Sequence, residues 1–298
     1  MKRISAPTAT TALPMILAAC AAPPPGPAPG DVNTPAGYAD GTRTVATPYL
    51  QFTATGKGVV TDSSGNISAA DVTATIRTRI TRDVIWVMEP TGMWQSQYWN
   101  TGTNSWIGWS ADSYLVKETA DGQARLIAYV MGAQGTSAGN QDSYIIMGLP
   151  TRPSAVGALS GSASYSGPAR LAVHYADGAG GYGNATGTAN LNVSFMPGGT
   201  STLQGTMTFN PAGADSPAHA IAPGTTITID PATISGNGFA TTLSPNPADI
   251  GLSSVGATDM SGQFYGPTAG IVGATFNGTG TAADGTTPAV FHGGLLAD

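Results

Sequence analysis

Short runs of β-branched and aromatic residues, separated by Gly, Pro, Asn and Asp, recur along most of this 298-residue chain. Runs such as VTATIRTRI, ARLIAYVMG and TANLNVSFM have the length of single strands, and several alternate apolar residues with Thr, Ser or Asn. The sequence carries no long amphipathic helical pattern. This punctuation predicts an all-β protein of antiparallel strands, built as a barrel or a sandwich, and disfavours an α/β fold.

Two series of such runs are separated by the segment LPTRPSAVGALSG at residues 149–161, whose prolines and small residues break the strand pattern. We therefore expect an N-terminal β-rich domain at residues 47–150 and a second β domain at residues 155–298. Within the first series, the turn TADGQ around Asp121 and Gly122 has the chemistry of a tight hairpin.

Composition narrows the class of protein. The chain holds 41 Gly and 22 Pro, and only 9% of its residues are charged, which is typical of extracellular β-rich proteins. The formal net charge of -6 argues against a nucleic-acid partner and against binding to anionic membrane surfaces, because both need clustered Lys and Arg.

The single cysteine, Cys20, ends the tetrapeptide LAAC, which follows a short basic start and an interrupted apolar run. This tetrapeptide resembles a bacterial lipobox, which implies a signal peptide at residues 1–19, cleavage before Cys20 and attachment of acyl chains, such as palmitate, to that residue. An ordinary signal peptide with a chance cysteine is the alternative. Ala21 after the cysteine implies transport onward to the outer membrane. The run is too short for a transmembrane helix, so the lipid is the expected membrane attachment.

Residues 20–46 begin with AAPPPGPAPG after the cysteine, a Pro-rich composition that cannot bury a core. We interpret this segment as a tether between the lipid and the folded part of the chain.

Motifs associated with catalysis are present but lack their structural context. GTSAG at residues 135–139 matches the G-x-S-x-G of serine hydrolases without a strand-turn-helix pattern, so a secreted hydrolase that uses Ser137 is the weakest hypothesis. GAGGYG at residues 178–183 lies between two strand runs, opens no helix and is expected to be a hairpin loop. His174, His219 and His292 show no paired spacing, so we expect no metal site, no cofactor and no catalytic residue.

Tryptophan is concentrated in one window, which also contains Tyr98. YWNTGTNSW predicts a hairpin with polar residues at its tip and tryptophans on its flanks. These side chains form either the core of the first domain or a surface that binds a protein or sugar partner. Nearby, Arg77 and Arg79 share one strand face, which is either solvated or a surface for an acidic partner. The candidate ligand-binding residues are Trp94, Tyr98, Trp99, Trp106 and Trp109.

The segment GQFYGPTAGIVGATF, starting at Gly262, sets aromatic residues among glycines near the end of the chain. We expect Gly266 and Pro267 to form a turn between two strands, Phe264 and Phe276 to face inward, and Gly273 to allow a close backbone approach or a bend. The pattern resembles the signature near the end of the β-barrel domains of transferrin-binding protein B and related surface lipoproteins. The matching positions are Gly262, Phe264, Tyr265, Gly266, Pro267, Ala269, Val272, Gly273 and Phe276.

Two further segments extend this resemblance over residues 155–298: ASYSG from Ala163 is similar to the opening strand of that barrel, and VFHGG from Val290 to its closing strand. The resemblance implies an antiparallel barrel of about eight strands. Ile271 and Ala274 depart from the pattern, since relatives usually carry an acidic residue and a glycine there. The chain is therefore identified as a divergent member.

The resemblance implies a binding protein without enzymatic activity, attached to the bacterial outer membrane through its lipid and exposed at the cell surface. Its expected partner is a protein or an iron-carrying ligand, and an outer-membrane transporter is a further candidate partner. The alternative is a structural or adhesive outer-membrane lipoprotein in which the barrel is only a scaffold.

Overall fold

The structure is a computed structural model of the whole chain. It describes the backbone of residues 42–43, 49–62, 64–79, 84–88, 94–100, 105–107, 112–118, 124–131, 141–178 and 180–298. Side chains are described for residues 55–62, 64–72, 124, 126, 128, 142–178 and 180–298.

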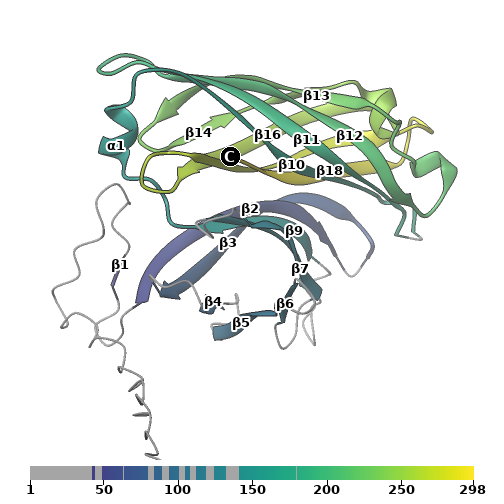
Figure 1. The fold of residues 1–298 in the computed structure, drawn as a ribbon. Helices are drawn as coiled ribbons and strands as arrows, with labels where there is room; N and C mark the ends of the chain where they lie inside the picture. Colours follow the sequence, from purple (N-terminus) through teal and green to yellow (C-terminus); the bar gives the residue numbers. More distant parts are fainter. Residues whose placement is uncertain are drawn as a thin grey trace, which may run out of the picture.

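The C-terminal strands form a closed antiparallel barrel (Figure 1). Its strands are β10 (Gly161–Tyr175), β11 (Tyr182–Phe195), β12 (Thr202–Ala214), β13 (Thr225–Ser235), β14 (Gly238–Thr241), β15 (Leu243–Pro245), β16 (Leu252–Tyr265), β17 (Ile271–Ala282) and β18 (Pro288–Ala297). The short β14 and β15 both pair with β13 and share one position, which leaves eight positions around the ring. The ring closes where β10, the first strand, pairs with β18, the last. The prediction of an eight-stranded antiparallel barrel is confirmed.

Successive side chains along each strand point alternately into the barrel interior and onto its outer wall. In β11 the buried Leu191, Val193 and Phe195 alternate with exposed Asn190, Asn192 and Ser194. The interior is filled by a continuous apolar cluster, and its largest fully buried side chains include Phe209, Phe264, Phe276 and Phe291.

The strands before residue 149 form a second antiparallel sheet in the order β6-β5-β4-β3-β2-β9-β8-β7, with β1 pairing to β2. These strands are β1 (Thr42–Arg43), β2 (Tyr49–Thr61), β3 (Ile67–Arg79), β4 (Val84–Met88), β5 (Trp94–Asn100), β6 (Ser105–Ile107), β7 (Asp112–Glu118), β8 (Ala124–Met131) and β9 (Gln141–Gly148). The antiparallel pairing of β7 with β8 confirms the hairpin predicted around Asp121.

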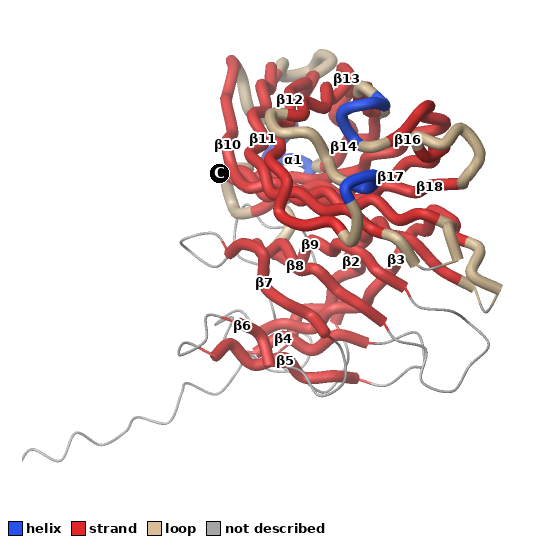
Figure 2. Tube along the Cα trace, turned by 90° about the vertical axis from the view of Figure 1, so that its right-hand side faces the viewer, coloured by secondary structure: helices blue, strands red, loops and turns tan. Residues whose placement is uncertain are grey.

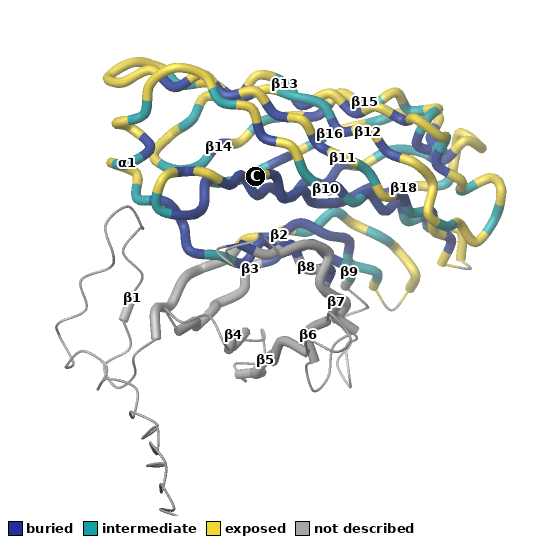
Figure 3. The backbone as a smooth tube through the Cα atoms, viewed as in Figure 1, coloured by how far each residue is buried: buried dark blue, intermediate teal, exposed yellow. Residues whose placement is uncertain are grey.

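This sheet packs on the outer wall of the barrel, where β2, β3, β8 and β9 contact β17 and β18 (Figure 2). A buried apolar cluster fills the contact, and Figure 3 shows that both surfaces are buried there. Gly273 of β17 lies at a close approach to this sheet, because a Cβ at that position would lie 2.7 Å from Cγ2 of Ile146. The approach at Gly273 is close, as predicted, but it is made to side chains, one of them Ile146 of the N-terminal sheet, and not to another backbone segment. The cluster consists of Ala124, Leu126, Ala128, Tyr144, Ile146, Tyr265, Ile271 and Leu296.

The segment that carries the aromatic and glycine signature is the β16–β17 hairpin, as predicted. Gly266 has a φ of 81°, a left-handed conformation that favours glycine, and Pro267 follows it in the turn. Phe264 and Phe276 are fully buried in the barrel interior, which confirms their expected inward direction. Ile271, one of the two departures from the expected pattern, lies in the apolar contact with the sheet, so an apolar side chain suits its surroundings.

The segment between the two sheets is fastened to the same hairpin. Thr151 is fully buried, its Oγ1 donates to the carbonyl of Gly266 at 2.6 Å, and its N–H donates to the carbonyl of Phe264 at 2.9 Å. A short helix, α1 (Pro153–Gly157), follows and places Val156 against the barrel core. Two 3-10 turns lie between barrel strands, η1 (Pro217–His219) and η2 (Pro247–Ile250). Within the described part of the chain, no helix has the length and apolar character that a membrane span requires.

Candidate functional site

The backbone forms the hairpin that was predicted around Trp99 and Trp106. β5 and β6 pair antiparallel with Trp99 opposite Trp106, which confirms the hairpin predicted from YWNTGTNSW. β6 ends the strand order of the sheet, and Figure 1 places β4, β5 and β6 on the side away from the barrel. The side chains of Trp94, Tyr98, Trp99 and Trp106 lie outside the described residues, as does the whole of Trp109.

Several other predicted features also fall outside the described residues: Cys20, the Ser137 segment, and the side chains of Arg77 and Arg79. The Gly178–Gly183 segment connects β10 to β11, two paired antiparallel strands, so the prediction of a hairpin loop is confirmed there.

The histidines show no paired spacing in the sequence, yet the fold places each of them beside carboxylates. Among the described residues, folding brings all three histidines into two groups that could hold a metal ion, Asp142 with His174 and His292, and Asp177 with Asp215 and His219. Neither group is visible in the sequence spacing, because antiparallel pairing and barrel closure bring its members together.

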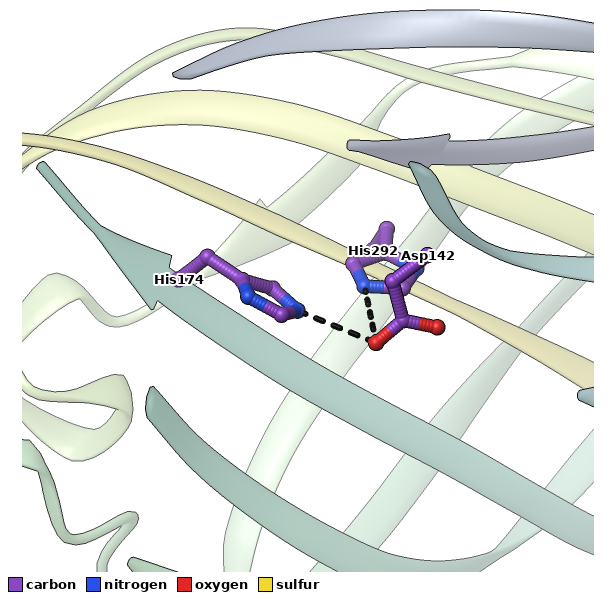
Figure 4. Close-up of side chains that lie close together, drawn as sticks. All are labelled: Asp142, His174 and His292. Carbon is purple, nitrogen blue, oxygen red and sulfur yellow. Dashed lines mark ion pairs between the residues drawn. The ribbon is translucent and has the colours of Figure 1, made fainter. Parts of the chain in front are cut away.

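The first group, which we call the interface triad, consists of Asp142 on β9, His174 on β10 and His292 on β18. In the β10–β18 pair, Ala172 is opposite His292, so His174 is its diagonal neighbour on the outer wall of the barrel. Oδ2 of Asp142 lies 3.2 Å from Nε2 of His174 and 3.8 Å from Nε2 of His292. Figure 4 shows both imidazole rings turned toward the same carboxylate oxygen.

The three members of the triad differ in burial, and His292 is the most buried of them. His292 is fully buried and neither of its ring nitrogens has a hydrogen-bond partner. Burial lowers the pKa of His292 to about 3, against the opposing effect of Asp142, so its ring is neutral at neutral pH. Burial alone would raise the pKa of Asp142, but the contacts with His174, with His292 and with the backbone N–H of Ser143 together outweigh it, and this pKa lies below the ordinary 3.8.

The second group lies around η1 and the β10–β11 loop. Nδ1 of His219 is 2.6 Å from Oδ1 of Asp215, and its Nε2 is 3.8 Å from Oδ2 of Asp177. The His219 ring stacks on Tyr175, with 4.1 Å between ring centroids. Contact with His219 lowers the pKa of the Asp215 carboxyl.

A buried lysine adds a further polar contact between sheet and barrel. Nζ of Lys57 on β2 donates to Asp71 on β3 at 2.7 Å and also to Asp259 on β16. The Lys57 side chain is 5% exposed, whereas Asp71 and Asp259 are 76% and 56% exposed. Burial acts to lower the pKa of Lys57, but the bonds to Asp259 and Asp71 together outweigh it and raise that pKa above 10.5.

These features define the class of the protein: a closed antiparallel barrel whose outer wall carries a second antiparallel sheet, with polar and charged groups bordering the contact. Residues 158–293 match the family model described as the C-lobe and N-lobe beta barrels of Tf-binding protein B. The barrel of this chain is therefore similar to the barrels of that family over residues 158–293.

The solved structures that match this chain include two transferrin binding proteins B. One is a double mutant of the vaccine antigen from Haemophilus parasuis, with a TM-score of 0.44 and 13% identity, covering 86% of this chain and 47% of that one. The other is the isotype 1 protein from serogroup B Neisseria meningitidis, with a TM-score of 0.43 and 17% identity, covering 82% of this chain and 43% of that one. This chain therefore spans less than half the length of either protein. No curated protein sequence gives a significant match.

Proposed function

We propose that this chain is a lipid-anchored binding protein of the bacterial cell envelope that captures a protein or iron-carrying ligand at the cell surface. The family match over residues 158–293 carries the proposal, because that family is described by the barrels of a transferrin-binding protein. The proposed organisation is a signal peptide at residues 1–19, a tether at 20–46, and two β domains at 47–150 and 155–298.

The mechanism in this proposal is surface recognition without bond chemistry. The β5–β6 hairpin supports it, because β6 ends the strand order and lies away from the barrel contact. Aromatic side chains are strong anchors in protein interfaces. We assign ligand binding to the tryptophan-rich segment and add an outer-membrane transporter as a second partner. The assigned residues are Trp94, Tyr98, Trp99, Trp106 and Trp109.

Direct binding measurements test the ligand proposal. The mature chain is immobilised and presented with iron-loaded and iron-free transferrin, each followed by surface plasmon resonance. We expect saturable binding that the double change Trp99→Ala and Trp106→Ala weakens by more than about tenfold, as for interface anchors. Tyr182→Ala is the matched control, because Tyr182 is an exposed aromatic residue of the barrel. Equal binding by both variants would contradict the assignment to the hairpin, and failure of every iron-carrying protein to bind would favour the scaffold alternative.

The anchor is tested separately in cells. Labelling with palmitate is expected to require Cys20, and the Cys20→Ser form should leave the membrane fraction. A Cys20→Ser form that still fractionates with membrane would overturn the lipid anchor. Protease treatment of intact cells then tests surface exposure, since only a protein on the outer face is digested.

A further inference from the structure

The interface triad contains a buried group whose polar atoms have no partner. His292 is fully buried, and both of its ring nitrogens lack a hydrogen bond; Nε2 of His174 lies near the Asp142 carboxylate but does not meet it with hydrogen-bond geometry. Buried polar groups in proteins are nearly always paired, so each exception calls for a physical explanation. The nearby carboxylate accounts for only part of this arrangement, because Asp142 lies at hydrogen-bond distance from His174 but 3.8 Å from His292.

We propose that Asp142, His174 and His292 form a binding site for a divalent transition-metal ion, with Zn²⁺ as the best-fitting ion. Two imidazole nitrogens and one carboxylate oxygen are a ligand set that zinc uses in proteins. An ion at this position would satisfy the lone pairs of both histidines at once.

The spacing of the three side chains fits such an ion. With bonds of about 2.0 Å, two ligand atoms of a tetrahedral zinc ion lie roughly 3.3 Å apart. The Asp142 oxygen is 3.2 Å from one imidazole nitrogen and 3.8 Å from the other, and all three ligand atoms lie within 4.8 Å of one another. Two imidazoles bound to one tetrahedral ion hold their ring centres about 5 Å apart. The His174 and His292 centroids are 5.2 Å apart.

An ion could reach the triad from solvent, and the three side chains leave one coordination position free. The side chains of Asp142 and His174 are 32% and 22% exposed, whereas His292 closes the inner side. Three protein ligands leave the fourth position of a tetrahedral ion for water. The Tyr144 ring covers His292, with 5.4 Å between ring centroids, and supports the orientation of its imidazole.

The second histidine group makes a weaker candidate. Nδ1 of His219 already contacts Asp215 at 2.6 Å, its ring stacks on Tyr175, and its side chain is 16% exposed, so neither ring nitrogen is a buried atom without a partner. It therefore provides the control position for the proposal.

A bound ion would join the two sheets. Asp142 comes from the N-terminal sheet, whereas His174 and His292 come from the barrel strands that close the ring. Metal binding would therefore stabilise the packing of sheet on barrel and raise the melting temperature of the whole chain.

The experiment uses the full chain, stripped of metal with a chelator and titrated with Zn²⁺ by isothermal titration calorimetry. We expect one ion per chain and a higher Tm at saturation. Changes to residues that merely surround a metal reduce affinity about 10- to 100-fold. The loss of a ligand in Asp142→Asn or His174→Gln should therefore exceed about 100-fold, whereas His219→Gln should bind as the unmodified chain does. Co²⁺ in place of Zn²⁺ adds a spectroscopic readout, because tetrahedral nitrogen and oxygen ligation gives visible absorption.

Three results would overturn the proposed metal site. Absence of saturable binding by the folded, metal-free chain would overturn the proposal. Unchanged affinity in Asp142→Asn and His174→Gln, with both variants folded by circular dichroism, would overturn it equally. Loss of binding in His219→Gln alone would assign the ion to the second group and would also reject the interface triad. None of these results depends on whether the protein captures an iron-carrying ligand.

Discussion

The barrel strands β16, β17 and β18 contribute side chains both to the barrel interior and to the contact with the sheet, but the two regions are built differently. Phe264 and Tyr265 are neighbours on β16, yet Phe264 points into the barrel core and Tyr265 into the contact with the sheet. The interior is an apolar cluster rich in aromatic rings. The contact is a smaller apolar cluster bordered by Lys57 and Asp259, by the Asn277 amide that donates to the carbonyl of Ala70, and by the interface triad.

This difference indicates that the two regions contribute differently. An apolar interior stabilises a fold through area removed from water and close packing, and it tolerates little change in volume. Polar groups that meet across a contact contribute less to stability and more to specificity of orientation. We therefore expect the interior to maintain the barrel, and the contact to fix how the sheet sits on its wall.

The largest effect is expected from truncation inside the barrel. Phe264→Ala should lower the free energy of unfolding by about 3–5 kcal/mol, because Phe264 is fully buried and its removal leaves a cavity. Ile271→Ala, in the contact, is the matched truncation. Hydrogen exchange should show that Phe264→Ala weakens the protection of β10 and β18, whereas Ile271→Ala acts mainly on β8 and β9. Equal loss of protection in both regions would mean that barrel and sheet unfold as one unit.

A smaller effect is expected from adding a methyl group at Gly273, where the barrel and the sheet approach closely. In Gly273→Ala the new Cβ would lie 2.7 Å from the Ile146 side chain and 2.9 Å from the Tyr265 ring, so the two layers must separate slightly. Overpacking of this kind destabilises by about 1–3 kcal/mol. Gly270→Ala, whose Cβ would meet only Thr268 at 3.8 Å, should change stability by less than about 0.5 kcal/mol. Chemical denaturation of both variants measures the difference, and equal values would show that the layers are not closely packed at Gly273.

Local sequence patterns were sufficient to predict the barrel hairpins. Alternating apolar and polar residues predict the side-chain directions in β11, and Gly266-Pro267 predicts a turn. The structure confirms both. The resemblance of residues 155–298 to a known family selected the barrel over the sandwich. The helix α1 in the junction was not predicted, because its five residues are too few to show a helical period.

The interface triad could not be predicted from spacing. His174 and His292 become neighbours only when the first and last barrel strands pair, and Asp142 reaches them only when the sheet docks on the wall. The sequence does indicate the direction of these side chains. Val173 and Phe291 face the barrel interior, so His174 and His292, which follow them on their strands, must face outward. Which outward residues meet depends on the register of barrel closure, and no local pattern encodes it.

The lysine that joins the two layers tests how much a charged contact contributes. Lys57→Met keeps the buried aliphatic chain but removes the bonds to Asp71 and Asp259, and we expect a loss of about 1 kcal/mol because both carboxylates are exposed and screened by solvent. The loss should shrink as salt is added, since salt screens exposed charges. Asp259→Asn removes only the charge on the barrel side and serves as the partner variant. A loss as large as that of Phe264→Ala would show that the contact stabilises the fold as strongly as the interior does.

The smallest effect at neutral pH, and one that grows in alkali, comes from buried tyrosines. Burial raises the pKa of Tyr165 to about 12, and burial together with the Asp215 charge raises that of Tyr175 to about 12. Because these values lie above the ordinary value near 10, the stabilisation is complete below pH 10 and is lost as the pH rises through 12. In the contact, burial raises the pKa of Tyr265 as well.

Absorbance at 295 nm should therefore show a late ionisation phase that coincides with the loss of strand signal in circular dichroism. Tyr165→Phe should reduce the late phase by one group while removing the bond to the carbonyl of Ala269. Complete ionisation of all tyrosines before any loss of strand signal would contradict the burial of these phenols in both regions.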